Sequence, residues 1–113
     1  MTTTTISLTR ISSPEAPPAR NTVAVALAGE LDVYTVARIE PTLTHLTRNA
    51  QAELTLDLTD ITFCDSSGAA LLLRVHERSQ AAGVRLRLSG IQRLPARVIR
   101  ALGVDRALSC SFA

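Results

Sequence analysis

The residues best placed to do chemistry stand together as Asp65-Ser66-Ser67-Gly68, between an apolar strand pattern and an aliphatic helix pattern. An aspartate or serine at such a junction accepts hydrogen bonds from the unpaired N–H groups of the first helical turn. The same N–H groups and the helix dipole also favour an anion placed there. These four residues alone therefore fit either a simple helix cap or a site that handles a negatively charged group.

Catalysis by this segment would require a base within hydrogen-bond reach of a serine. Of the two histidines, His45 falls on an earlier helix pattern. His76 lies about 15 Å beyond Ser66 along the same helix pattern, since each helical residue adds 1.5 Å. The residue order is also not the Gly-x-Ser-x-Gly nucleophile elbow. We therefore expect that the chain is not an enzyme.

Metal and nucleotide sites are not indicated either. Asp57, Asp60 and Asp65 crowd the end of one strand pattern, with Asp32 near them, but their spacing matches no ligand loop for Mg²⁺ or Ca²⁺. Asp60 fits better as the residue that ends the strand, and Asp57 as an acceptor for nearby N–H groups. The chain has no lysine and so no Gly-x-x-x-x-Gly-Lys phosphate loop. We expect neither a metal nor a cofactor.

The composition argues against two further classes of protein. A net charge of only +2 and 3% aromatic residues do not provide a nucleic-acid-binding surface. The arginines of the last helix pattern, Arg93, Arg97 and Arg100, fit a solvated face. The apolar runs are too short for a membrane span, and the sequence shows no signal-peptide pattern, so a cytoplasmic protein is the expectation.

Strand and helix patterns alternate and predict a single α/β domain over residues 1–113, in the order ββαβαβα(β). Alternating apolar residues predict strands at 3–11, 22–27, 54–58, 84–88 and 107–112. A Pro-rich loop at 12–21 joins the first two as an antiparallel hairpin. The pattern predicts a mixed sheet of four to five strands with helices packed mainly on one side. Whether a weak homodimer forms through the edge strand stays open.

Helical spacing predicts three helices, one opened by Leu31-Asp32, one at 66–82 and one at 94–102. Asp32 fits the cap of the first helix. Pro41 costs about 3 kcal/mol inside a helix, so we expect a kink there or a helix that restarts at Pro41. Leu73 leans away from the buried stripe of the second helix and is either a partner contact or ordinary core. The expected stripe is Leu71, Leu72, Val75 and Ala82.

Ser66 remains as a residue on which another protein acts. It should lie on the surface at a helix start, as both a cap and an accessible acceptor, with Gly68 leaving room for an approaching backbone. A phosphate there adds about −1.5 to −2 charges, which the helix N-terminus tolerates. With Asp32, Asp60 and Asp65 nearby, the surface would become strongly negative and repel a docked partner.

Two segments of the chain together resemble the signature of STAS domains. Phe63-Cys64-Asp65-Ser66-Ser67-Gly68 before an aliphatic helix is similar to one hallmark of that family. Leu27-Ala28-Gly29-Glu30-Leu31-Asp32 is similar to the other hallmark, the Gly-Glu-Leu-Asp turn before the first helix. The resemblance extends from about residue 22 to the C-terminus and implies the STAS fold.

As a short stand-alone domain, the chain resembles the bacterial anti-sigma factor antagonists, also called anti-anti-sigma factors. The resemblance implies a protein that binds an anti-sigma factor serine kinase and so frees a sigma factor. It implies phosphorylation of the serine after the signature aspartate, here Ser66, and reversal by a PP2C-type phosphatase. The docking surface implied by the resemblance, with Leu73 added because it leans away from the buried stripe, comprises Asp32, Asp65, Ser66, Ser67, Gly68, Ala69 and Leu73.

A second group of STAS domains offers an alternative interpretation, a subunit that binds an ABC-transporter ATPase in lipid transport. Such subunits resemble this chain in the run Gly68-Ala69-Ala70-Leu71-Leu72-Leu73. They tend to carry threonine where Ser66 stands, which favours the anti-sigma factor antagonist.

Overall fold

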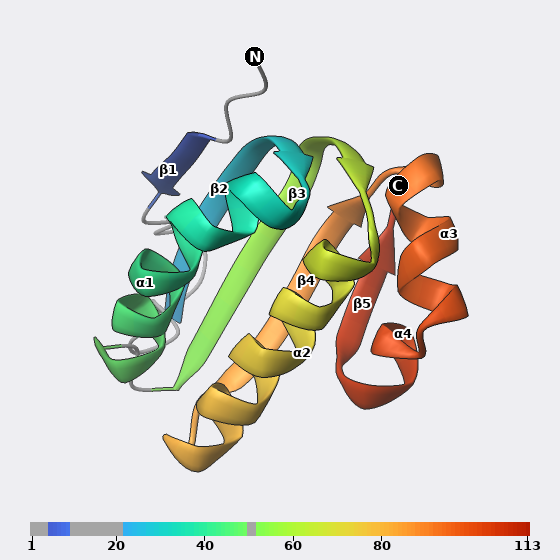
Figure 1. The fold of residues 1–113 in the computed structure, drawn as a ribbon. Coiled ribbons are helices and arrows are strands. Elements are labelled where there is room, and N and C mark those ends of the chain that lie inside the picture. The colour runs from blue at the N-terminus through green and yellow to red at the C-terminus, as the bar shows by residue number, and fades with distance from the viewer. Residues whose placement is uncertain (1–4, 10–21, 50–51) are drawn as a thin grey trace, which may run out of the picture.

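A computed structural model describes residues 5–9, 22–49 and 52–113, which form a five-stranded sheet and four helices (Figure 1). In chain order they are β1 (Thr5–Thr9), β2 (Thr22–Leu31), α1 (Val33–Asn49), β3 (Glu53–Cys64), α2 (Ser66–Ala81), β4 (Arg85–Ile91), α3 (Arg93–Ala101), α4 (Val104–Ala107) and β5 (Ser109–Phe112). The predicted order is confirmed, with the short α4 added before the last strand. The expected Pro-rich loop at 12–21 lies outside the described residues.

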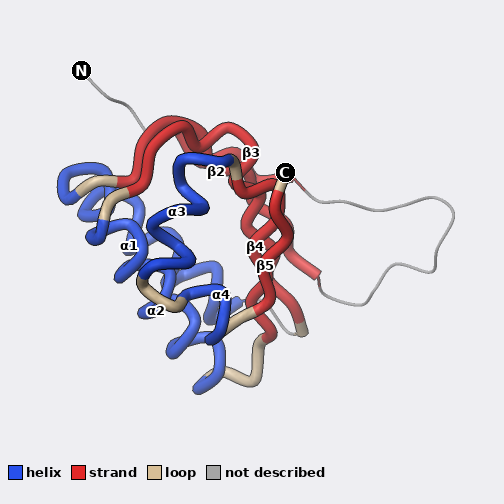
Figure 2. The backbone as a smooth tube through the Cα atoms, turned by 90° about the vertical axis from the view of Figure 1, so that its right-hand side faces the viewer, coloured by secondary structure: helices blue, strands red, loops and turns tan. Residues whose placement is uncertain are grey.

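The strands lie in the sheet in the same order as in the sequence, β1-β2-β3-β4-β5. β1 pairs antiparallel with β2, and every later pair is parallel. All four helices lie on one side of the sheet (Figure 2). The mixed sheet with helices on one side, predicted from the sequence, is therefore confirmed. No helix in the described ranges combines the length and apolar composition that a bilayer crossing requires.

The core lies between this sheet and the helices, and β3 is its centre. Leu54, Leu56 and Leu58 of β3 are almost completely buried, and they alternate with residues that face away from the helices. The register places Leu54 beside Val23 and Leu86, and Leu56 beside Val25 and Leu88. Rows of aliphatic side chains thus cross three strands, which is how a chain with few aromatic residues builds its core.

β2 and β3 both run further than predicted. β2 continues through Gly29, whose φ is 115°, to Leu31, and β3 continues through Asp60 to Cys64. The assignment of Asp60 as the end of the strand was wrong. Two irregularities, between Ala26 and Ala28 and between Gly29 and Glu30, let the two strands keep pairing beyond the point where simple alternation ends.

Pro41 lies inside one continuous helix, α1, so the predicted restart at Pro41 was wrong. The ring cannot donate a hydrogen bond to the carbonyl one turn earlier. Pro41 is on the exposed face, where water can satisfy that carbonyl. On the opposite face Val36, Ile39 and Leu43 are buried, and their burial offsets the cost of the proline.

α2 ends as predicted, with Gly83 at a φ of 72° after the last helical residues. Leu71, Leu72 and Val75 are completely buried, as the stripe required. Ala82 was wrongly included, because it is the C-cap residue and is exposed.

An ion-pair network joins α2 to α1. The Glu40 carboxylate accepts two hydrogen bonds from Arg74, both 2.9 Å long, and one of 2.8 Å from Arg78. The hydrogen bonds from Arg74, together with the interaction with Arg78, lower the pKa of Glu40 from its ordinary value of 4.5 to about 2. A carboxyl with a lowered pKa in the folded state stabilises the fold above pH 4.5, and that stabilisation is lost as the pH falls towards 2.

Glu40→Gln is therefore expected to lower the free energy of unfolding by about 1 kcal/mol at pH 7, a modest value because the arginines are partly exposed. The difference from the wild type should shrink progressively below pH 4.5. Urea unfolding at several pH values measures it. Glu77→Gln, which removes the same charge from an exposed position of α2, is the control and should change stability little. Equal losses in both variants would contradict a specific role for the network.

Candidate functional site

The site is built where β2 and β3 end side by side and α1 and α2 begin. Leu31 pairs with Cys64 at the last position of both strands. Each strand is then followed by an aspartate, Asp32 or Asp65, and by a helix. The parallel pairing therefore brings together two turns that are more than thirty residues apart in the sequence.

Asp65 is the N-cap of α2. Its Oδ1 accepts hydrogen bonds from the N–H groups of Ser67, at 2.9 Å, and Gly68, at 3.1 Å. These are two of the four N–H groups that a helix leaves unpaired at its start. The structure thus confirms a cap at the junction, and the capping side chain is the aspartate.

Asp32 caps α1 in the same way, as predicted. Its Oδ1 accepts from the N–H groups of Tyr34 and Thr35, each at 2.9 Å. The Thr35 hydroxyl in turn accepts from the Asp32 N–H and donates to the Glu30 carbonyl at 2.7 Å. Sequence analysis missed Thr35, whose hydroxyl, three positions after the cap, takes the place that a Glu or Gln side chain has in a capping box.

A direct contact fixes the two turns to each other. The Asp65 N–H donates to the Leu31 carbonyl at 3.1 Å. Gly68 packs against the same residue: a Cβ at Gly68 would lie 2.7 Å from both the Cβ of Leu31 and the Sγ of Cys64. The missing side chain of Gly68 therefore makes room for the neighbouring turn. Gly68 is buried, so the prediction that it leaves room for the backbone of a partner was wrong.

Ser66 is exposed and is the first residue of α2, so it is not the cap, contrary to our expectation. In the described part of the chain, no group forms a hydrogen bond with its hydroxyl. His76 lies ten residues further along the same helix. The hydroxyl of Ser66 is thus accessible, and nothing in its described surroundings activates it as a nucleophile.

The remaining predicted contact residues differ in how much surface they offer. Ser67 is half-buried, and Leu73 is partly buried against the core. Ala69 is completely buried, so its side chain cannot touch a partner in this conformation. Asp32 and Asp65 are half-buried beside the exposed Ser66, and Asp60 is exposed on β3. The accessible part of the predicted surface is therefore the pair of turns and not the helix that follows them.

Cys64 lies directly beneath the site. Burial, with a smaller effect of the Asp65 carboxylate, raises the pKa of its thiol from 9.0 to about 11. The thiol is therefore protonated at neutral pH and is not a reactive thiolate. Its role here is to fill the space beside Gly68.

Sequence analysis also missed three apolar residues at this end of the molecule. Val33 and Tyr34 open α1 and are 58% and 80% exposed. Phe63, near the end of β3, is 44% exposed. The sequence places Val33 and Tyr34 only within the first helix pattern, and Phe63 only within the motif that resembles the STAS signature. Exposure could not be deduced from those patterns, because it depends on which helices cover the end of the sheet.

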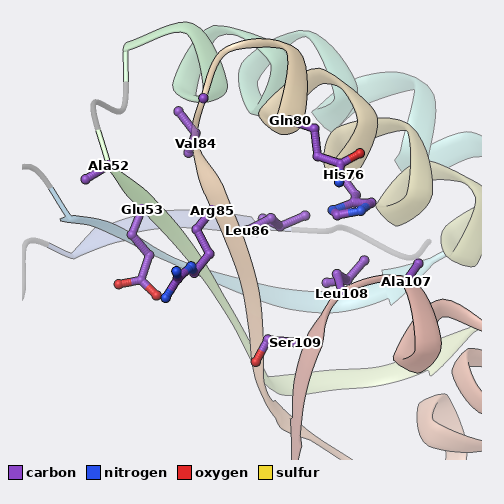
Figure 3. Close-up of a pocket in the computed structure, with 11 residues that line it drawn as sticks. Ala52, Glu53, His76, Gln80, Val84, Arg85, Leu86, Ala107, Leu108 and Ser109 are labelled. Carbon is purple, nitrogen blue, oxygen red and sulfur yellow. The ribbon is translucent and has the colours of Figure 1, made fainter.

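A cleft of about 710 Å³ lies away from this site, between the second half of α2 and the segment that joins α4 to β5 (Figure 3). His76 and Gln80 project from α2 towards Leu108, across from Leu86 of β4. The cleft contains none of the residues predicted to surround Ser66. His76 lines this cleft and therefore lies far from Ser66, the serine for which it was considered as a base.

Comparison with known families identifies a domain over most of the chain. The family model described as "Mlab, STAS domain" matches residues 17–109. The match includes both motifs on which the resemblance to STAS domains was based, and it confirms that resemblance. No curated protein matches the chain.

Solved structures of the same fold include anti-sigma factor antagonists. The unphosphorylated form of SpoIIAA is 21% identical, with a TM-score of 0.72, and the match covers 94% of this chain and 87% of that one. An anti-sigma factor antagonist from Mycobacterium paratuberculosis is 20% identical, with a TM-score of 0.75 and coverage of 96% and 86%. The phosphorylated form of SpoIIAA, from Bacillus, is 21% identical, with a TM-score of 0.66 and coverage of 94% and 90%. These likenesses confirm the fold.

The close approach of the two turns leads to a prediction for Gly68→Ala. In most helix interiors this change stabilises a protein by about 0.5–1 kcal/mol. Here the added methyl group meets Leu31 and Cys64, so we expect a loss of about 1–3 kcal/mol in the free energy of unfolding. Ser67→Ala, at the adjacent half-buried position, should stay within about 0.5 kcal/mol of the wild type. Denaturant unfolding of both variants is the measurement, and a stabilised Gly68→Ala would contradict the packing.

Proposed function

Because the chain belongs to the STAS domain family, we propose that it is an anti-sigma factor antagonist. In this role it binds an anti-sigma factor serine kinase and so releases a sigma factor. Phosphorylation of Ser66 switches the binding off, and a PP2C-type phosphatase restores it. The chain itself performs no catalysis and acts in the cytoplasm, where the transcription machinery is.

The observation that carries the proposal is the state of the Ser66 side chain. It is exposed, it stands at the first position of α2, and its hydroxyl has no hydrogen-bond partner among the described residues. A kinase can therefore reach the hydroxyl without breaking any interaction of the fold. Ser67, by contrast, is half-buried, and its N–H is held by Asp65.

The position of Ser66 also supports a switch that leaves the fold intact. A phosphate at a helix N-terminus interacts favourably with the helix dipole and adds about −1.5 to −2 charges. Asp32 and Asp65 are close by, so the surface of the two turns becomes strongly negative. A partner docked on this surface is then repelled. The unphosphorylated and phosphorylated forms of SpoIIAA both share this fold, which supports a change of surface and not of structure.

The first test is to identify the modified residue. The protein is incubated with ATP and the kinase that co-purifies with it from its native host, and the phosphopeptides are mapped. We expect phosphate on Ser66, its loss in Ser66→Ala, and normal modification of Ser67→Ala. Phosphate on Ser67 or elsewhere, with Ser66 unmodified, would contradict the assignment. Co-purification of a transport ATPase in place of a kinase would favour the alternative role in lipid transport.

The second test concerns the charge. Ser66→Asp is expected to fold normally, because an acid is favourable in the first turn of a helix, and to bind the kinase at least tenfold more weakly. Ser66→Asn introduces a side chain of nearly the same shape as aspartate but without the charge, and this variant should bind like the wild type. Isothermal titration calorimetry gives the affinities, and a thermal melt verifies folding. If Ser66→Asp unfolds, the residue is chiefly structural, and if it binds unchanged, repulsion is not the mechanism.

A further inference from the structure

Exposed apolar residues lie on or next to the two turns that flank Ser66. We call Val33, Tyr34 and Phe63 the apolar rim. They are three of the five large hydrophobic residues that are exposed in the described part of the chain, the others being Leu94 and Leu102 of the α3 region. The whole sequence has one tyrosine and two phenylalanines, and the rim exposes two of these three aromatic side chains. A protein this poor in aromatic residues has placed most of them at one end of its surface.

The contacts of the two turns place the rim beside Ser66. Val33 and Tyr34 follow Asp32 directly, and the Tyr34 N–H is bonded to the Asp32 carboxylate at 2.9 Å. The Asp65 N–H is bonded to the Leu31 carbonyl at 3.1 Å. Phe63 lies on β3 opposite Glu30 of β2, just before the Asp65 turn. All three residues are therefore within a few positions of the hydrogen bond that joins the turn of Ser66 to the turn of Asp32.

The fold makes little use of these side chains. Tyr34 is 80% exposed, and among the described residues its phenol group forms no hydrogen bond. Single exposed apolar residues are ordinary on a protein surface, but adjacent ones at a functional site mark an interaction surface. Tyrosine is among the residues that most often dominate the energy of protein interfaces, since its ring buries a large area and loses little conformational freedom.

We propose that the apolar rim is the surface by which this protein is held on the kinase that phosphorylates Ser66, with Tyr34 as its main anchor. The inference rests on the proposed function and names the residues that supply its affinity. A stable interface covers about 800 Å² on each partner, a disc of about 16 Å radius if it is round. A kinase whose active site reaches the Ser66 hydroxyl must therefore also cover the adjoining turn. The rim fits a partner with an apolar recess for the Tyr34 ring.

This arrangement separates affinity from switching. The rim supplies buried apolar area in both phosphorylation states, and the charge on Ser66 decides whether the docked state is tolerated. Tyr34 does not contact the reacting hydroxyl through any described interaction, so it is an anchoring residue and not a catalytic one. Replacing Tyr34 should weaken the binding of the kinase and leave the rate of phosphoryl transfer unchanged.

The test uses the full chain and the co-purified kinase with ATP. Tyr34→Ala is expected to raise the KM for this protein as a substrate at least tenfold, with kcat unchanged, and to weaken binding in calorimetry by a similar factor. Tyr34→Phe keeps the ring and should stay within about twofold of the wild type. Leu102→Ala, an exposed apolar residue at the far end of α3, is the matched control and should not differ from the wild type. Thermal melts verify that each variant is folded.

The outcomes separate the two proposals. If the wild type is bound and phosphorylated at Ser66 while Tyr34→Ala has the same KM and affinity, the anchor is wrong and the proposed function stands. If the wild type is neither bound nor phosphorylated by the kinase, the proposed function fails and the anchor with it. Analytical ultracentrifugation tests whether a second copy of the chain binds the apolar rim instead of the kinase. A dimer that Tyr34→Ala abolishes would assign the rim to that second copy and overturn the proposal.

Discussion

The contact between the two turns is the constraint on which the rest of the site depends. The hydrogen bond from the Asp65 N–H to the Leu31 carbonyl, and the packing of Gly68 against the Leu31 side chain, hold the starts of α1 and α2 next to each other. The two helix starts are neighbours only because β2 and β3 stay paired to their last residues, Leu31 and Cys64. If either strand ended earlier, Asp32 and Ser66 would belong to separate surfaces.

Each of the two aspartates combines its structural role as a cap with the role in recognition that is proposed for it. In each described contact, Asp32 and Asp65 use Oδ1 for the two N–H groups of their own helix. The caps therefore fix both carboxylates in place. Their negative charge then lies beside Ser66 without any flexible side chain having to be ordered when a partner docks, which keeps the entropic cost of recognition low.

Local signals explain what the sequence could predict. Three features each depend on only a few neighbouring residues, so they could be predicted from the sequence: the alternation in β3 and β4, the helix end at Gly83 and the cap at Asp32. The errors came from interactions between distant segments. The continuation of β3 past Asp60 depends on irregular pairing with β2, and the role of Gly68 depends on Leu31, a residue of another turn. The sequence predicts Ser66 as a cap because aspartate and serine are both favourable N-cap residues, and only the backbone geometry decides between Asp65 and Ser66.

The proposed mode of switching follows from the position of Ser66 at the start of α2. A phosphate placed in the middle or at the end of a helix would oppose the helix dipole or break contacts, and the fold itself would then respond. At the first position of α2 the phosphate meets the positive end of the helix dipole and solvent, and the buried residues Gly68 and Ala69 need not move. The fold can therefore remain the same in both states while the surface potential changes. The proposed switch requires its affinity to come from neighbours that the phosphate does not disturb, and the candidates for this role are the exposed apolar residues of the two turns.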